Sequence, residues 1–572
     1  MRHGARLTLA AVVAGVALLL PAAASAHAYL TKTAPAASVI LNASPASVQL
    51  TYDEAVEPRF ALISVTDADA KSQTTGPVRR SPSNPDTLVV PLKHVAEGWY
   101  LVYWRAISVD GHPVQGAFTF AVGPNAGPQP QFKIPRIAGT ATSTPLVIAK
   151  WLAFLTVMSA IGLFVLRTLI ARPLVSQVAG TSLRTVSIAF FVAAGLGLLA
   201  VAVYLEEATS IDSLRSFWDL GGVLPLWRAT AFGRGWVDIE LCFALFCAAA
   251  IVAIWVDRPE REGRSVASLL ALSGALFAAA SVLVLPGAVG HAGQTSPRGL
   301  AVPLDWFHLV SGSLWIGGLI GLVVLWSSLG AAQRVPGLVV CVPRFSNVAF
   351  VSVMVLLGTG VAASILHLPV LAALWQTSYG KAILVKSAIL LAAMLVASVN
   401  LLRTKPGLAH ADTSAASARL LRRLVSVEVV LVAGAILVGA ILSSLAPPPP
   451  SFAEEGSALA RVGPGKVAST VNRNGYKLQV LVDPNKAAAP NSFALKLSRG
   501  GEPVRGANVT LEFEMLDMQM PSQEFQLDET TPGVYTRNAP ALVMVGHWGL
   551  AFSVTPRGGQ PFTALVVDRA SG

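Results

Sequence analysis

Residues 7–27 read LTLAAVVAGVALLLPAAASAH, and this stretch decides how the rest of the chain is arranged. Arginines precede the apolar run, and a proline and a series of small residues follow it. A charged start, a short apolar segment and an Ala-x-Ala site are typical of a secretory signal peptide, and the apolar segment is too short to span a membrane. We therefore predict a signal peptide over residues 1–26, with His27 as the first residue of an exported mature chain.

The composition predicts a polytopic membrane protein. Of the 572 residues, 53% are hydrophobic and only 13% are charged, and the mean hydropathy is +0.60, whereas soluble proteins carry about 25% charged residues. The cysteines, Cys242, Cys247 and Cys341, all lie in the apolar central part, so the flanking regions hold no disulfide and depend on ordinary hydrophobic cores. Eight stretches have spanning length: 145–166, 185–204, 236–256, 266–286, 303–327, 345–367, 380–402 and 424–445.

The distribution of basic residues gives this block an orientation. The net charge of +11 collects in the loops between spans, so we attribute it to membrane topology and predict no nucleic-acid partner. With the first domain outside, the odd-numbered loops are cytoplasmic and carry most of the loop arginines and lysines. The outer loops carry only Arg215, Arg228, Arg234 and Arg298. The positive-inside rule then places the chain in the cytoplasmic (inner) membrane, with both soluble domains extracytoplasmic.

Two soluble regions, residues 27–125 and 471–572, flank the membrane block and show the alternation typical of strands. In the first, strands are predicted at 48–52, 61–66, 87–92, 99–107 and 117–122. In the second, they are predicted at 476–482, 492–497, 508–514, 533–535, 547–554 and 562–568. The predicted fold class is therefore mixed: a polytopic α-helical membrane domain of eight spans (145–445), flanked by two extracytoplasmic all-β sandwich domains and joined to them by linkers at 126–144 and 446–470.

The first soluble region contains a candidate metal site. In Asp110-Gly111-His112 a carboxylate and an imidazole are two residues apart, and side chains at i and i+2 of an extended stretch point to the same side. A terminal His27 would add its α-amino group, its imidazole and the next backbone nitrogen, a nitrogen-rich set that suits Cu(II). His94 lies near a turn, and we interpret it as a surface histidine.

This region resembles the CopC family of exported copper-binding proteins. The residues that carry the likeness are His27, Trp104-Arg105, the 110–113 turn and the strand at 116–120. The resemblance implies that His27, Asp110 and His112 bind Cu(II). Some members of the family also carry a methionine-rich loop for Cu(I), but residues 27–130 contain no methionine, so we predict no Cu(I) site in this domain.

Ionisable residues gather at the outer depth of the membrane block. His291 follows the fourth span, Asp305 and His308 lie in the first turns of the fifth, and His367 closes the sixth. Ionisable groups inside a membrane are costly and usually functional, so we interpret this set as an ion path. The alternative is that the individual histidines at span ends face lipid headgroups. The same outer third also contains Asp238, Glu240 and Lys386.

This block resembles the CopD family of multi-span copper proteins. The likeness rests on Gly290–Gly293, His308–Gly318, Thr377–Lys386, Asn400 and Arg423 with Glu428. It implies copper movement across the inner membrane, usually uptake, and the fusion to a CopC-like domain would raise the effective concentration of copper. For Glu428 we favour a local ion pair with Arg422 or Arg423 over a release or gating role. Cys242 and Cys247 are interpreted as packing residues, with transfer of Cu(I) as the alternative.

The last domain looks similar to the YtkA-like extracytoplasmic domains. The likeness rests on the segment 515–520 and on the Gly546-His547-Trp548 turn. The nearby residues Met518, Met520, Met544 and His547 combine soft thioethers with an imidazole, a set that suits Cu(I). The alternative is that these methionines fill the core.

Together these patterns predict a membrane protein that captures Cu(II) outside the cytoplasmic membrane and transports copper across it. Its partners would be an extracytoplasmic copper donor and a cytoplasmic copper acceptor. One alternative is copper resistance by sequestration without transport. A redox protein with haem on both membrane sides is disfavoured, because no histidine lies in the inner half of a predicted span. The sequence shows no nucleophile–base arrangement and no nucleotide-binding loop, so we do not expect an enzyme.

Overall fold

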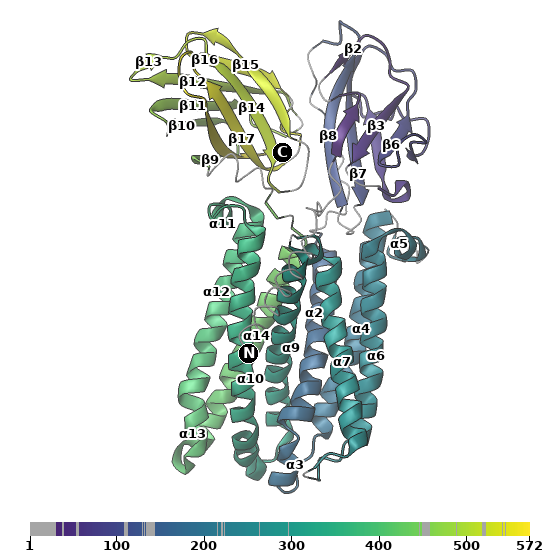
Figure 1. Cartoon of the computed structure of the whole chain (residues 1–572), viewed down its shortest axis with the longest axis vertical. Coiled ribbons are helices and arrows are strands. Elements are labelled where there is room, and N and C mark those ends of the chain that lie inside the picture. Colours follow the sequence, from purple (N-terminus) through teal and green to yellow (C-terminus); the bar gives the residue numbers. More distant parts are fainter. Residues whose placement is uncertain are drawn as a thin grey trace, which may run out of the picture.

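A computed structural model gives the architecture as a helical bundle with two β domains side by side at one of its ends (Figure 1). This arrangement confirms the predicted fold class. The structure describes residues 30–36, 39–52, 56–107, 113–127, 130, 132, 143–213, 216–218, 221, 223–261, 263–295, 297–445, 447–448, 458–487, 489–517, 522–539, 541–543 and 545–571.

The N-terminal domain consists of two four-stranded sheets, in the orders β1-β3-β6-β5 and β2-β8-β7-β4. Along β7, alternate residues enter the space between the sheets, where Tyr100, Val102 and Trp104 are buried with Val48 and Leu50. The strands are β1 (Leu30–Ala34), β2 (Ile40–Leu41), β3 (Ser47–Tyr52), β4 (Leu62–Thr66), β5 (Arg79–Arg80), β6 (Thr87–Pro91), β7 (Gly98–Ile107) and β8 (Pro113–Val122), with a short helix η1 (Pro58–Phe60).

The bundle contains eight helical segments that are long and apolar enough to cross a membrane. The helices are α2 (Thr144–Val165), α3 (Pro173–Gln177), α4 (Arg184–Ser213), α5 (Val223–Ala229), α6 (Ala231–Val256), α7 (Val266–Val289), α8 (His291–Gln294), α9 (Arg298–Ser328), α10 (Ala331–His367), α11 (Ala373–Gln376), α12 (Ser378–Val399), α13 (Lys405–Ala409) and α14 (Ala411–Leu442). Two spans continue into π-helical turns, η2 (Leu166–Ile170) after α2 and η4 (Asn400–Thr404) after α12.

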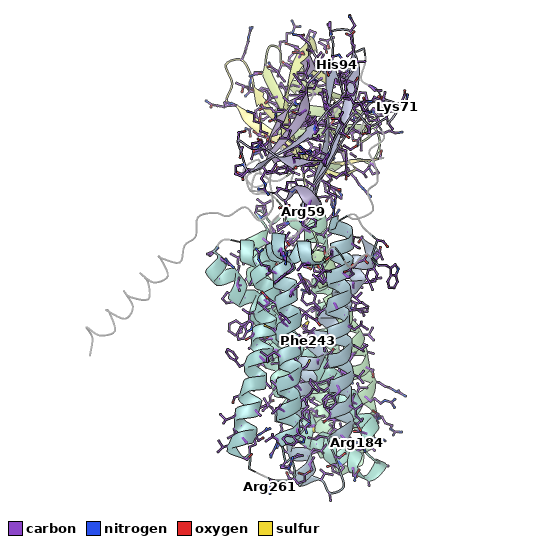
Figure 2. All side chains as sticks on the ribbon, turned by 90° about the vertical axis from the view of Figure 1, so that its right-hand side faces the viewer. Arg59, Lys71, His94, Arg184, Phe243 and Arg261 are labelled. Carbon is purple, nitrogen blue, oxygen red and sulfur yellow. The ribbon has the colours of Figure 1, made fainter. Side chains whose placement is uncertain are left out.

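One carboxylate fastens the end of the bundle that lies away from the β domains. Buried Asp257, which follows α6, lies 2.9 Å from Arg167 Nη1, 3.1 Å from Arg172 Nε and 3.8 Å from Arg264 Nη1. Arg172 also donates to the carbonyl oxygens of Arg258 and Arg261. Figure 2 shows Arg261 at this end and Arg59 at the junction with the N-terminal domain. The loops predicted to be cytoplasmic are thus cross-linked by charge.

The C-terminal domain is built on a continuous ten-stranded sheet that folds into two layers. Strand β15 joins the layers, because its first half pairs with β14 and its second half with β16. The predicted strands correspond to β11, β12, β14, β16, β17 and β18, while β9 and the first part of β10 fall in the segment expected to be a linker. The strands are β9 (Ala460–Val462), β10 (Val467–Arg473), β11 (Tyr476–Asp483), β12 (Asn491–Arg499), β13 (Glu502–Pro503), β14 (Asn508–Met515), β15 (Gln523–Thr531), β16 (Val534–Ala539), β17 (Gly546–Thr555) and β18 (Phe562–Ala570).

Both β domains are packed onto their surroundings by apolar contacts. In the N-terminal domain, Phe60 and Ile107 belong to the buried cluster of the helices α2, α4, α6 and α7. In the C-terminal domain, Leu516, Leu565 and Val567 form a buried cluster with Ala373 of α11. The two domains also share one cluster, because the outer face of the β7–β8 pair, with Leu101, Tyr103 and Ala117, is buried together with the core of the C-terminal domain.

Candidate functional site

The predicted Cu(II) ligands His27, Asp110 and His112 lie outside the described residues. The strands on either side of the 110–112 segment are described, and Ile107 of β7 pairs with Pro113 of β8. Ile107 is buried against the helices. The strand ends that flank this segment therefore lie at the membrane-facing end of the N-terminal domain, whereas Figure 2 shows His94 at the far end.

The bundle contains a cavity of about 880 Å³ at the end that faces the C-terminal domain. Its walls come from helices α2, α4, α6, α7, α9, α10, α12 and α14. Helix α10 packs chiefly on α9, and α12 packs chiefly on α14. The lining is mostly apolar, but five ionisable side chains face it: Lys150, Asp305, His308, His367 and Lys386.

Three of the four residues predicted for the membrane path line this single cavity: Asp305, His308 and His367. The fourth, His291, begins α8; its side chain lies outside the described residues, but its neighbours Gly290 and Ala292 line the cavity. Asp238, by contrast, is exposed, and Glu240 is half-buried on α6 away from the cavity lining.

His308 is held so that its Nε2 carries a free electron pair. Its Nδ1 lies 2.9 Å from Oγ1 of Thr359, and that hydroxyl donates its own hydrogen to the Val355 carbonyl at 2.7 Å. In the tautomer that fits both bonds, the hydroxyl accepts from His308 Nδ1–H, and Nε2 of the neutral imidazole is unprotonated. The ring lies against Gly360 of α10, where a Cβ would be in ordinary contact at 3.9 Å from His308 Cε1. Fixing one ring nitrogen in this way is characteristic of metal-binding histidines.

His367, at the end of α10, has the same arrangement. Its Nδ1 lies 2.7 Å from the Ala363 carbonyl oxygen, which can only accept, so Nδ1 carries the hydrogen. Its Nε2 accepts from the Thr295 hydroxyl at 3.1 Å. The ring also lies beside Tyr379 of α12, with 6.3 Å between the ring centroids. A ligand that displaced the Thr295 hydroxyl would find a basic nitrogen at the cavity rim.

Two lysines bring positive charge into the same cavity. Lys386 acts electrostatically on both Asp305 and His308, and its Nζ reaches α14, where a Cβ on Gly439 would lie 3.5 Å away. Lys150 donates to the Ser443 carbonyl at 3.2 Å and to the Ser444 hydroxyl at 3.4 Å. The sequence placed Lys386 at the right depth, but it gave no signal for Lys150, an isolated lysine in the first turns of a span.

The cavity also presents thioethers from Met158 of α2 and Met394 of α12. The sequence did not indicate them as ligands, because a single methionine in an apolar span cannot be distinguished from a packing residue. Among the described residues, no group of three His, Cys, Asp or Glu side chains comes close enough to hold one metal ion. The described lining thus contains no closed chelate of three such side chains.

A second histidine–carboxylate pair lies where the C-terminal domain meets the bundle. His547 Nδ1 is 2.9 Å from Asp517 Oδ2, and the backbone N–H of His547 donates to the same oxygen at 2.8 Å. Ser378, in the first turn of α12, donates to Asp517 Oδ1 at 2.9 Å. Burial alone would raise the pKa of Asp517, but the hydrogen bonds from His547 and Ser378 outweigh it and hold that pKa below its ordinary value.

This pair is the described part of the predicted Cu(I) site. Met518, Met520 and Met544 lie outside the described residues. The neighbouring Met515 is buried in the core of the domain, so it fills space there.

Glu428 differs from the expectation of a local ion pair. Its carboxylate accepts from the Asn400 amide and lies within hydrogen-bonding reach of the Trp315 indole. In the part of the chain that the structure describes, it forms no ion pair with Arg422 or Arg423; the Arg422 guanidinium lies over the Trp326 ring instead, 5.9 Å from its centroid.

Three family models match successive parts of the chain. The family model for the CopC domain matches residues 30–123, that for Copper resistance protein D matches residues 339–442, and the YtkA-like model matches residues 470–552.

Individual relatives cover the chain to different extents. Copper transport protein CutJ of Bacillus subtilis (strain 168) is 26% identical over 541 residues, which is 93% of each chain. Protein YobA of Escherichia coli (strain K12) is 37% identical over 98 residues, 17% of this chain and 79% of its own. The crystal structure of CopC from Methylosinus trichosporium OB3b has 29% identity and a TM-score of 0.16, and the match covers 19% of this chain and 100% of that one.

Proposed function

We propose that this chain, which belongs to the CopC family through its first domain and joins it to Copper resistance protein D and YtkA-like domains, binds copper outside the cytoplasmic membrane and transports it inward. A relative that aligns over nearly the whole length is named a copper transport protein. Copper is the cargo in this proposal. The observation that carries it is the cavity in which His308 and His367 each present an unprotonated Nε2.

In the first step, His27, Asp110 and His112 capture Cu(II) at the mature N-terminus. Amine and imidazole nitrogens with one carboxylate suit Cu(II). The position of Ile107 against the helices supports delivery from this site to the bundle, because the 110–112 segment connects strand ends that face the membrane domain. Donor and acceptor belong to one chain, so transfer is intramolecular and does not depend on the concentration of a free carrier.

In the second step, copper enters the cavity and moves between single ligands. A site with one imidazole or one thioether binds copper more weakly than a chelate, so the ion can leave again, and conduction needs binding sites that release what they bind. The presence of Asp305, His308 and His367 in one cavity lining, together with Met158 and Met394, supports a relay of this kind. His547, with Nδ1 engaged by Asp517, offers its Nε2 as a further copper ligand where the C-terminal domain meets the bundle.

Cellular copper content after brief exposure to limiting copper tests the proposal. The comparison includes cells that lack the protein and cells that carry the wild-type chain, His112→Ala or His308→Ala. His94→Ala is the matched control, since it removes a histidine at the far end of the N-terminal domain. We expect the wild type and His94→Ala to raise copper content, and both His112→Ala and His308→Ala to abolish the rise.

The same measurement separates transport from sequestration. If the wild type lowers cytoplasmic copper, the chain is a resistance protein that holds copper outside. If His308→Ala transports like the wild type, the cavity is not the path.

A further inference from the structure

Glu428 is a buried carboxylate near the middle of α14. It lies on α14 with only 3% of its surface exposed. The groups that reach it are neutral: the amide nitrogen of Asn400 donates to its Oε1, and the Trp315 indole lies on another side. Asn400 is itself fixed, because its side-chain oxygen accepts from the Thr404 hydroxyl at 3.0 Å.

This carboxylate lies directly below the floor of the cavity. The deepest lining residues on α9, α12 and α14 are Trp315, Met394 and Val432. Val432 is one helical turn from Glu428, so both lie on the same face of α14. Trp315 contacts both the cavity and the carboxylate, since it lines the cavity and its indole reaches Glu428. Trp315 and Val432 are buried, so side chains close the floor.

Glu428 differs from the buried carboxylate Asp257 in lacking a cationic partner among the described residues. A buried negative charge without a partner is costly, and a site of this kind favours the arrival of a cation. Asn400 starts the π-helical turn η4, and single π-helical turns are frequent at functional sites. Asn400, which donates to Glu428, therefore belongs to the irregular helical turn that follows α12.

We propose that Glu428 is the inner cation site of the transport path, which receives the copper ion from the cavity after Trp315 moves aside and passes it toward the cytoplasmic end. The proposal rests on the transport function stated above. In this arrangement His308 and Met394 bind the copper that enters the cavity, and Glu428 receives the copper that leaves it. A carboxylate is a weaker ligand for copper than the imidazoles above, which favours release at this end.

The test uses the purified full-length chain in vesicles loaded with a copper-sensitive dye, together with the copper bound per chain at equilibrium. Glu428→Gln keeps the shape and accepts the same hydrogen bonds but has no charge. We expect it to lower the initial transport rate by at least about tenfold while the copper bound per chain stays at the wild-type level. His308→Ala should lower both quantities. Asp238→Asn, which removes an exposed carboxylate of α6 that is not among the cavity-lining residues, is the matched control and should leave both unchanged.

A transport rate for Glu428→Gln within about twofold of the wild type would show that Glu428 only joins helices, and would overturn the inner site. If Glu428→Gln is not recovered in folded form, Glu428→Asp carries the test: it keeps the charge but withdraws the carboxylate from Asn400, so an unchanged rate overturns the proposal and a slower rate with full copper binding supports it. If the wild type itself moves no copper, the transport function has failed, and the inner site fails with it.

Discussion

The two ends of the helical bundle handle charge in opposite ways. At the end away from the β domains, which we call the inner end because we predict that it faces the cytoplasm, three arginines surround the carboxylate of Asp257, and further carbonyl oxygens accept from Arg172. At the outer end, Asp305, His308, His367 and Lys386 line an open cavity of about 880 Å³. Saturated charges hold helices in place, whereas separated polar groups around a cavity leave room for a ligand. The difference indicates that the Asp257 cluster holds the helices together at one end and that the other end can admit a ligand.

The largest effect should come from removing the carboxylate of the inner end. Asp257→Asn leaves Arg167 and Arg172 buried without a countercharge, which typically costs about 3–5 kcal/mol. We expect a strongly lowered thermal unfolding temperature of the purified protein in detergent. Asp412→Asn, an exposed aspartate at the same end, is the control and should unfold like the wild type. An Asp257→Asn protein as stable as the wild type would mean that the two ends do not differ in the way described.

The stability contributed by Asp517, at the contact between α12 and the C-terminal domain, should decrease as the pH falls. Asp517 has a lowered pKa in the folded protein, so its carboxylate contributes stability above the unfolded value of about 3.9, and this contribution is lost as the pH falls through the folded value. Asp517→Asn should cost about 1–3 kcal/mol at pH 7 and much less at pH 3.

Thermal unfolding of both proteins across this pH range checks the prediction. Asp568 acts in the opposite direction, because burial raises its pKa to about 6, so its carboxylate costs stability as the pH rises toward and past that value. Asp568 is present in both proteins, so its effect cancels in the difference between their free energies of unfolding. A difference that stays constant from pH 3 to pH 7 would contradict the assigned role of Asp517.

The smallest effect concerns the charge inside the cavity. Lys386→Met removes a positive charge that acts on Asp305 and His308, so copper should bind the cavity up to about tenfold more tightly, as expected for an ionic repulsion of about 1.4 kcal/mol. Calorimetric titration of the purified chain with copper measures this change. Lys405→Met, on α13 at the inner end, should leave the affinity as it is. Weaker binding by Lys386→Met would mean that the lysine supports the site rather than opposing the cation.

The sequence predicted the parts of the fold that depend on periodicity. The eight spans and most of the long strands follow from residues that repeat along single elements, as in β7, where Tyr100, Val102 and Trp104 alternate into the core. Strand β15 was missed, because Gln523–Thr531 has little apolar alternation and lies partly in each layer.

The candidate site was predictable where its residues share one helix. Asp305 and His308 were placed on one face of α9, and both line the cavity. The sequence did not identify three further lining residues, Lys150, Met158 and Met394. They meet only because of the way α2, α9 and α12 cross, and this crossing cannot be predicted from a single residue in an apolar span. For Glu428, nearby arginines were favoured as partners, but the π-helical turn brings Asn400 to the carboxylate instead. The Cu(II) ligands His27, Asp110 and His112 stay a prediction.

The apolar cluster shared by the two β domains has a consequence for how the protein is made. Leu101, Tyr103 and Ala117 are synthesised early, but the residues buried with them in the C-terminal domain follow only after the whole membrane block. At about 5–20 residues per second, this delay lasts tens of seconds. During that time the outer face of the first domain lacks part of its cover and is a target for chaperones or proteases. Closure of this face marks the moment at which the newly made chain is complete.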